Sequence, residues 1–295
     1  ANESTTNIEV ELQAAVEDPG QDVLKMPAIR VAVPAGQTVT TNITQRWPAP
    51  HMWSYADPYL YHLRSELSTG DRLRTRFGFR EFRVEGSDFY LNDVKVHLLA
   101  SSAWPPREPA TREQIEAQWR GVKSFGAYAF RTHTQPWPAA WYEAADEIGL
   151  LVTIEGAVWN DDDTYRIYDP VFWDNYARQL QSMVRRHKNH PSVVMWSLEN
   201  EFFGGRLNDR SSAKADLVRM GRLMKTWDPT RPILYESDGD PGGVADVIGL
   251  HYPHEYPEYT CWPNEAFWLD KPQTIRDLFL NGESQFLWRK DKPLY

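Results

Sequence analysis

The sequence predicts a β-sandwich over residues 1–82, followed by an incomplete (β/α)8 barrel over residues 83–295. Three observations lead to this expectation. The first eighty or so residues contain short runs in which apolar and polar residues alternate, the period of a half-buried strand. From Phe82 onward, strand-like and helix-like segments take turns, as in parallel sheets with crossover helices. The sequence suggests about six such units and the start of a further strand, whereas a closed barrel has eight.

The short runs at the start of the chain predict the strands Asn7–Leu12, Ile29–Val33, Thr38–Ile43 and Tyr59–Leu67. Glycine and proline residues separate the first three runs, and a turn over residues 68–71 closes the last one. Short strands with this spacing are typical of two-layer sandwiches.

The barrel strands are expected at Val94–Ala100, Ala127–Arg131, Leu150–Glu155, Val193–Leu198, Pro232–Glu236 and Val247–His251, with another beginning at Pro293. Thr111 predicts the start of the first helix, because Gln114 completes a capping box. Apolar spacing predicts later helices over Trp141–Ile148, Phe172–Val184, Leu217–Met224 and Thr274–Trp288. An open, doubly wound sheet is the alternative, but no glycine-rich phosphate loop follows the first strand.

Composition narrows the classes of function. The net charge of −9 argues against nucleic acid or an anionic membrane as a partner. No apolar run is long enough to cross a bilayer, and the single cysteine, Cys261, excludes an internal disulfide and a multi-cysteine metal site. We expect no cofactor and no metal. The sequence indicates no compartment and leaves an oligomer possible.

Tryptophan is unusually frequent, with 13 residues, and an indole face matches the apolar face of a pyranose ring. We expect most of them, including Trp119, Trp141 and Trp173 on helix faces, to fill the core. The better candidates for stacking on sugars follow predicted strand ends: Trp104, Trp137, Trp159 and Trp262.

Polar side chains gather where the predicted barrel strands end. His133 follows the second strand, Glu155 ends the third, Glu199 to Glu201 follow the fourth, and Tyr252 follows the sixth. Active sites of such barrels lie at the carboxyl ends of the strands. Carboxylates and imidazoles at this position suit glycosidic cleavage, which needs a proton donor and a second carboxylate.

The segment Asn189–Glu201, which reads NHPSVVMWSLENE, resembles the acid/base signature of glycoside hydrolase family 2. This family of retaining barrel glycosidases contains β-galactosidases, β-glucuronidases and β-mannosidases. Further segments resemble the family in order and spacing: Phe77–Arg80, Arg131–His133, Asp146–Val152 and Asp228–Pro232. The resemblance implies that the sandwich is immunoglobulin-like.

The resemblance also implies roles for single residues. Glu201 would be the general acid/base and Asn200 would bind the sugar hydroxyl next to the reacting carbon. His133 would contact sugar hydroxyls, Tyr252 would hydrogen-bond the nucleophile, and Arg131 would help to keep that nucleophile ionised. Apart from the resemblance, Glu155 is either a substrate contact or a partner of Arg131, and Trp159 is a candidate sugar platform because it follows a predicted strand end. Glu199 is an alternative acid, but the asparagine before Glu201 favours Glu201.

The chain departs from the family pattern in three places. The family's nucleophile is a glutamate shortly after a Lys-Pro-aromatic stretch, which Lys292–Tyr295 resembles, so we expect the nucleophile to lie beyond Tyr295. The leading jelly-roll domain of the family is missing from the front. Ala157 stands where the family's β-galactosidases commonly carry histidine, so the sugar remains open.

The expected function is hydrolysis of terminal β-glycosidic bonds by double displacement, with a carbohydrate and the remaining segments of the parent polypeptide as partners. This chain alone is then expected to be inactive. The alternatives are an endo-acting polysaccharide hydrolase of the same clan and a non-catalytic carbohydrate-binding fragment.

Overall fold

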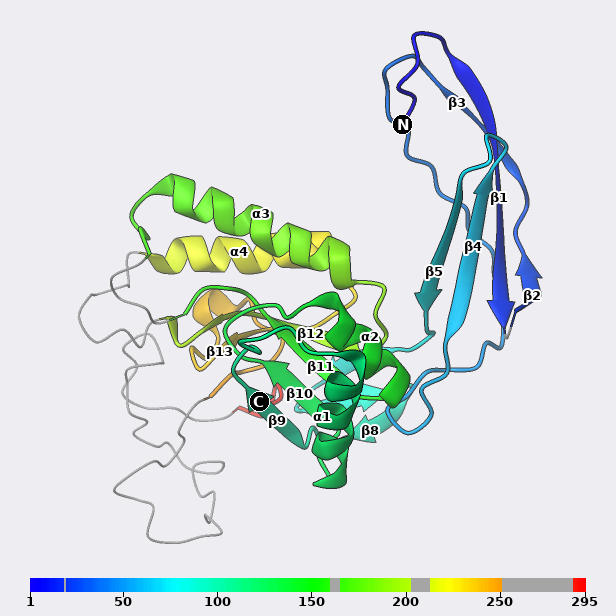
Figure 1. The fold of residues 1–295 in the computed structure, drawn as a ribbon. Coiled ribbons are helices and arrows are strands. Elements are labelled where there is room, and N and C mark those ends of the chain that lie inside the picture. Colours follow the sequence, from blue (N-terminus) through cyan, green and yellow to red (C-terminus); the bar gives the residue numbers. More distant parts are fainter. Residues whose placement is uncertain (19, 160–164, 203–212, 251–288) are drawn as a thin grey trace, which may run out of the picture.

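The computed structural model describes residues 1–18, 20–159, 165–202, 213–250 and 289–295 (Figure 1). In these residues it contains an antiparallel sheet of five strands, a short three-stranded sheet and a parallel sheet of five strands with four α-helices and a 3-10 helix, Pro241–Gly243. The N-terminal sheet projects from the rest of the molecule.

The N-terminal sheet is built around one long central strand. It contains β1 (Ile8–Asp18), β2 (Gln21–Lys25), β3 (Ile29–Val33), β4 (Tyr61–Leu67) and β5 (Arg72–Phe77). β1 pairs with β2, β3 and β4, and β5 pairs with β4, all antiparallel. The expected strands at Ile29–Val33 and near Tyr59–Leu67 are confirmed, whereas β2 and β5 were not predicted.

The strand expected at Thr38–Ile43 is wrong. Residues 38–42 are exposed, and no backbone hydrogen bond to a neighbouring strand is recorded for this segment among the described residues. Alternating polarity does not make a strand unless a partner takes up its N–H and C=O groups. The described strands of the N-terminal region therefore belong to one antiparallel sheet, and the immunoglobulin-like form of the sandwich stays a prediction.

The parallel sheet has the strand order β13-β12-β11-β10-β9. Its strands are β9 (Ala100–Ala103), β10 (Ala129–Thr132), β11 (Leu151–Glu155), β12 (Val193–Asn200) and β13 (Ile233–Glu236). Spatial order follows chain order without reversal, as in a barrel, whereas a doubly wound sheet reverses at a switch point. The open-sheet alternative is therefore wrong.

Two further segments extend this sheet beyond β13. The Val247 amide donates to the Ile233 carbonyl at 3.2 Å, and Ile248 forms a parallel bridge with Leu294. The Leu250 amide donates to the Tyr295 carbonyl at 3.0 Å, and the Tyr295 amide donates to the Ile248 carbonyl at 2.9 Å. The expected sixth strand and the extended segment at Pro293 are thus present as neighbours, while His251 and the helix expected at 274–288 lie outside the described residues.

Four helices pack against the sheet: α1 (Arg112–Ser124), α2 (Ala139–Ile148), α3 (Pro170–His187) and α4 (Lys214–Trp227). The capping box at Thr111 and Gln114 is confirmed. Trp196 and Leu198 of β12 face the core shared with the helices, whereas Met195 faces a second core inside the sheet's curve. Because both faces are buried, all eight residues of β12 are inaccessible. No helix in the described ranges is long and apolar enough to span a membrane.

The strand expected at Val94–Ala100 is in fact two. Val94–Val96 is β8, the last strand of a meander with β6 (Phe82–Glu85) and β7 (Asp88–Leu91). The barrel strand β9 begins at Ala100, opposite Ala129. Its sequence, Ala-Ser-Ser-Ala, has weak strand propensity, so the pattern places the strand too early.

One carboxylate ties the N-terminal region to the parallel sheet. Asp146 accepts hydrogen bonds from Ser192 Oγ at 2.6 Å and Arg76 Nη2 at 3.2 Å, and its Oδ2 lies 2.6 Å from His190 Nδ1. Its carbonyl accepts from the buried Trp53 indole at 2.8 Å. Close by, a Cβ at Gly149 would lie 2.4 Å from the Tyr55 carbonyl oxygen, and φ is +82°, so only glycine fits there.

The buried imidazole of His187 should make stability depend on pH. Burial, together with the nearby His190 and Arg186, lowers its pKa to about 4. The unfolded chain takes up this proton near pH 6.5, so the unfolded state binds more protons between about pH 6.5 and 4. The free energy of unfolding therefore falls as the pH drops through this range.

His187→Phe keeps a ring against Tyr142 but cannot take up a proton. We expect the free energy of unfolding of this variant to fall less on acidification, by up to about 3 kcal/mol. Urea unfolding of both proteins at pH 7 and pH 4.5 measures the difference. Equal loss of stability in the two proteins would contradict it.

Candidate active site

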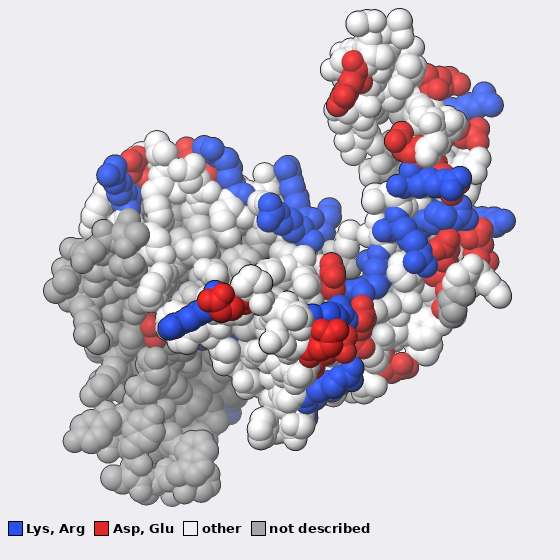
Figure 2. Space-filling view, in the orientation of Figure 1, with Lys and Arg blue, Asp and Glu red and all other residues white. Residues whose placement is uncertain are grey.

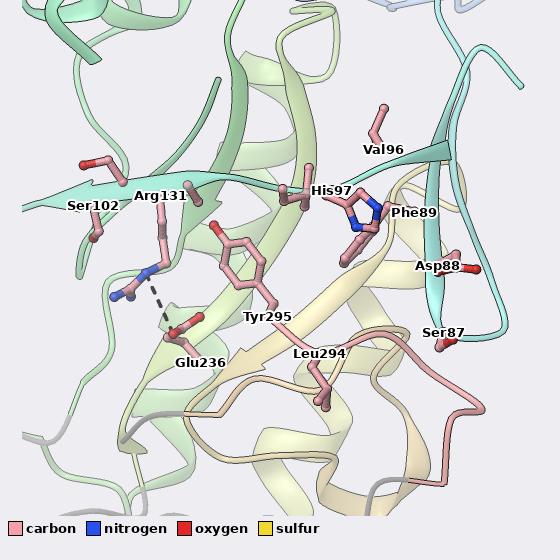
Figure 3. A pocket seen from close by; sticks show the side chains of 13 residues that line it. Ser87, Asp88, Phe89, Val96, His97, Ser102, Arg131, Glu236, Leu294 and Tyr295 are labelled. Carbon is pink, nitrogen blue, oxygen red and sulfur yellow. Dashed lines mark ion pairs between the residues drawn. The ribbon is translucent and has the colours of Figure 1, made fainter. Parts of the chain in front are cut away.

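The buried guanidinium of Arg131 is the centre of the candidate site. Its Nη1 donates to both oxygens of Glu155, at 2.9 and 2.7 Å, and to Asn200 Oδ1 at 3.0 Å. Its Nε lies 3.9 Å from Glu236 Oε1, and Figure 3 marks this ion pair with a dashed line. Burial opposes the charge, but Glu236 and Glu155 outweigh this effect and raise the Arg131 pKa. These contacts of Arg131 join the carboxyl ends of four consecutive strands, β10 to β13.

Glu155 is fully buried and its carboxylate oxygens are occupied by protein groups. Besides Arg131, it accepts from the Thr134 amide at 2.6 Å and from Ser197 Oγ at 3.0 Å. Burial raises its pKa to about 7, although the Arg131 charge acts in the opposite direction. Of the two roles expected for Glu155, the geometry favours the structural partner of Arg131. Thr134 and Ser197 were not predicted, since single hydroxyl residues carry no sequence pattern.

The last residues of β12 are held from both sides. The Asn200 amide donates to the Val158 carbonyl at 3.0 Å, and the Glu201 amide donates to the Glu236 carbonyl at 2.9 Å. With Asn200 Oδ1 bound to Arg131, its Nδ2 faces Glu201 Oε2 at 3.4 Å. Glu201 has φ +54°, a conformation that costs about 1 kcal/mol in a non-glycine residue. These backbone contacts fix the point from which the half-buried Glu201 side chain extends.

Glu199 differs sharply from Glu201. It is fully buried, and its Oε2 accepts the Phe202 amide at 2.8 Å. Burial and the neighbouring Asp238 raise its pKa well above the ordinary value. A group enclosed in this way cannot meet a substrate from solvent, so the geometry favours Glu201 over Glu199 as the acid.

Three rings meet at the same edge of the sheet, each following a different strand. Trp104 follows β9 and lies 4.2 Å, centre to centre, from the ring of His133, which follows β10. Trp159 follows β11 and lies 5.8 Å from Trp104, nearly perpendicular to it. Trp137, expected as a sugar platform, is instead buried against Trp119 and Trp141, so that expectation is wrong.

Other expected site residues lie elsewhere. Tyr252 and Trp262 are outside the described residues. A cavity of about 530 Å³ lies beside Arg131 and Glu236, and its wall includes Ser102 of β9 and the ring of Tyr295 (Figure 3). Within the described ranges, no group of three or more His, Cys, Asp or Glu residues could hold a metal ion.

Comparison with known proteins places the fold in a family. The family model "Glycosyl hydrolases family 2, TIM barrel domain" matches residues 81–281, and the model "Glycosyl hydrolases family 2" matches residues 1–80. The chain belongs to glycosyl hydrolase family 2. The predicted family and the barrel are therefore confirmed, while the division at residue 82 and the site roles stay predictions.

The relatives of this family 2 chain are much longer than it is. β-Galactosidases of Psychromonas ingrahamii and Vibrio cholerae are 29% and 28% identical over 79% of the chain, which spans 24% and 23% of their lengths. Solved structures with the same fold include a β-galacturonidase from Eisenbergiella tayi, with a TM-score of 0.71 and 22% identity over 84% of this chain and 44% of that one. A β-glucuronidase from Bacteroides uniformis has a TM-score of 0.70 and 23% identity, over 83% of this chain and 32% of that one.

Removing the central guanidinium should destabilise the protein. Arg131→Met leaves Glu155 buried without its cation, and we expect a loss of about 3–5 kcal/mol in the free energy of unfolding. Arg83→Met is the matched control, because the carboxylates that pair with Arg83 are exposed, and it should cost less than about 1 kcal/mol.

Urea unfolding measures both losses. In the double variant Arg131→Met/Glu155→Gln, the loss should be smaller than the sum of the single losses, because no unpaired carboxylate remains. Simple additivity, or a loss no larger than in the Arg83 control, would contradict this description of the site.

Proposed function

We propose that the complete protein hydrolyses terminal β-glycosidic bonds with retention of configuration, and that Glu201 is the general acid/base. The observation that carries this proposal is the placement of Glu201 directly after the fourth strand of the parallel sheet, with its backbone fixed by Glu236 and its carboxylate beside Asn200. Active sites of barrels lie at this end of the strands.

The surroundings of Glu201 suit a group that must donate a proton near neutral pH. Glu155 and Glu236 lie buried at the same edge, and Arg131 is the cation paired with both of them. Negative charge nearby favours the protonated form of a carboxyl group, as a general acid requires.

In the proposed mechanism, Glu201 protonates the leaving oxygen while a carboxylate attacks the anomeric carbon and forms a glycosyl-enzyme ester. Glu201 then removes a proton from the water that hydrolyses this ester. We infer that the nucleophile is a glutamate beyond Tyr295. The greater length of the β-galactosidase relatives agrees with a contribution from other parts of the polypeptide.

The remaining residues have supporting roles in this proposal. Asn200, oriented by Arg131, would bind the hydroxyl next to the reacting carbon, and His133 and Trp159 would contact the sugar ring. Arg131 would act through Asn200 and the carboxylates around it, with Glu155 as its positioning partner. Tyr252 would hydrogen-bond the nucleophile. We also keep the immunoglobulin-like form of the N-terminal region as a proposal.

The relatives named β-galactosidase make a β-galactoside the first substrate to test. In the complete protein, Glu201→Gln should lower kcat by about 10²–10⁴ on 4-nitrophenyl and alkyl β-galactosides, because these leaving groups need a proton. With a 2,4-dinitrophenyl galactoside, kcat/KM, which reports formation of the ester, should fall much less, because this leaving group needs no proton. Azide should restore turnover, because it attacks the ester without needing a base. A panel of nitrophenyl β-glycosides replaces the galactosides if another sugar is cleaved faster.

The matched control is Glu199→Gln, two residues earlier. Glutamine keeps an oxygen that can accept the Phe202 amide, so we expect activity within about fivefold of the unmodified protein. Full activity of Glu201→Gln on an alkyl glycoside, or collapse only in Glu199→Gln, would remove Glu201 from its role.

A further inference from the structure

An aromatic corner, made of Trp104, His133 and Trp159, lies at the carboxyl ends of β9, β10 and β11. The Trp104 ring contacts both of the other rings. The corner is continuous with the proposed acid/base, because Trp159 forms a parallel bridge with Asn200, the residue before Glu201. Three side chains from separate strands are therefore gathered beside the candidate site.

Trp104 is unlike the core tryptophans. It is 61% exposed, whereas Trp53, Trp119, Trp173 and Trp196 are 0–1% exposed. Pro105 and Pro106 follow it directly and restrict the backbone at Trp104, so the ring is presented by a stiff segment. A large apolar surface held open on a stiff support at a candidate site suggests a ligand face.

We propose that Trp104, together with His133 and Trp159, forms a stacking subsite for a neutral pyranose ring of the substrate, an inference that rests on the proposed function. The C–H groups on one face of a pyranose form an apolar surface that packs on an indole, and the imidazole can exchange hydrogen bonds with hydroxyl groups at the ring edge.

The charges at this edge favour a neutral sugar over a uronic acid. The buried cation, Arg131, is already paired with the carboxylate of Glu155 and lies beside that of Glu236. A sugar carboxylate entering this part of the site would meet like charges, which costs binding energy.

The test uses the complete protein in a Glu201→Gln background, so that binding is measured without turnover. Calorimetric titration with methyl β-galactopyranoside compares the parent with Trp104→Ala, Trp104→Phe and Phe125→Ala. Phe125 is the matched control, since it is 91% exposed but follows α1 rather than a strand end.

We expect Trp104→Ala to weaken binding about tenfold or more, Trp104→Phe to lose less, and Phe125→Ala to bind like the parent. Galacturonate should bind the parent more weakly than the neutral sugar. In the Glu201 protein, Trp104→Ala should raise KM far more than it lowers kcat.

Unchanged sugar affinity in Trp104→Ala would overturn the subsite. If the melting temperature also fell, Trp104 would instead pack against another segment of the polypeptide. Galacturonate binding as tight as that of the neutral sugar would overturn the preference for an uncharged ring. Failure of the proposed function is a separate result, since it appears as full activity in Glu201→Gln.

Discussion

The geometry of the site depends on one interaction, the pairing of the buried Arg131 guanidinium with the groups around it. A charged side chain is stable in the interior only when carboxylates and hydrogen-bond acceptors surround it, and here they come from the ends of β11, β12 and β13. The same bonds that satisfy the guanidinium also fix the amide of Asn200. The surroundings of the half-buried Glu201 carboxylate are thus set by a buried network of charges and hydrogen bonds.

The two cores of the parallel sheet explain why it can hold such a network. Helices cover one face, and the short β6–β8 meander contributes Phe82 and Phe89 to the core on the other. Strands fixed on both faces cannot shift in register without exposing large side chains. The strand ends therefore keep their relative heights. Side chains from β10, β11 and β12 meet within hydrogen-bond distance, and Glu236 of β13 lies within ion-pair distance of Arg131.

The parts of the fold that sequence predicts well are those with buried, continuous apolar strands. Strands β10 to β13 were located to within two residues at each end, because runs such as Val193–Leu198 are hydrophobic on both faces. The errors, Thr38–Ile43 and the boundary near Ala100, occur where pairing rather than composition decides. At the site, a recognisable motif indicates Glu201. The hydrogen bonds from Thr134 and Ser197 to the Glu155 carboxylate join residues far apart in the sequence, and no local pattern predicts them.

The close approach at Gly149 has a consequence for how this architecture can vary. The loop that carries Trp53 and Tyr55 rests on the turn after α2 with no room for a side chain. A relative with any larger residue at this point must tilt the leading region away or rebuild the loop. The residue at position 149 of a homologue therefore indicates whether its N-terminal region is placed against the barrel as it is here: glycine permits this placement, and a larger residue does not.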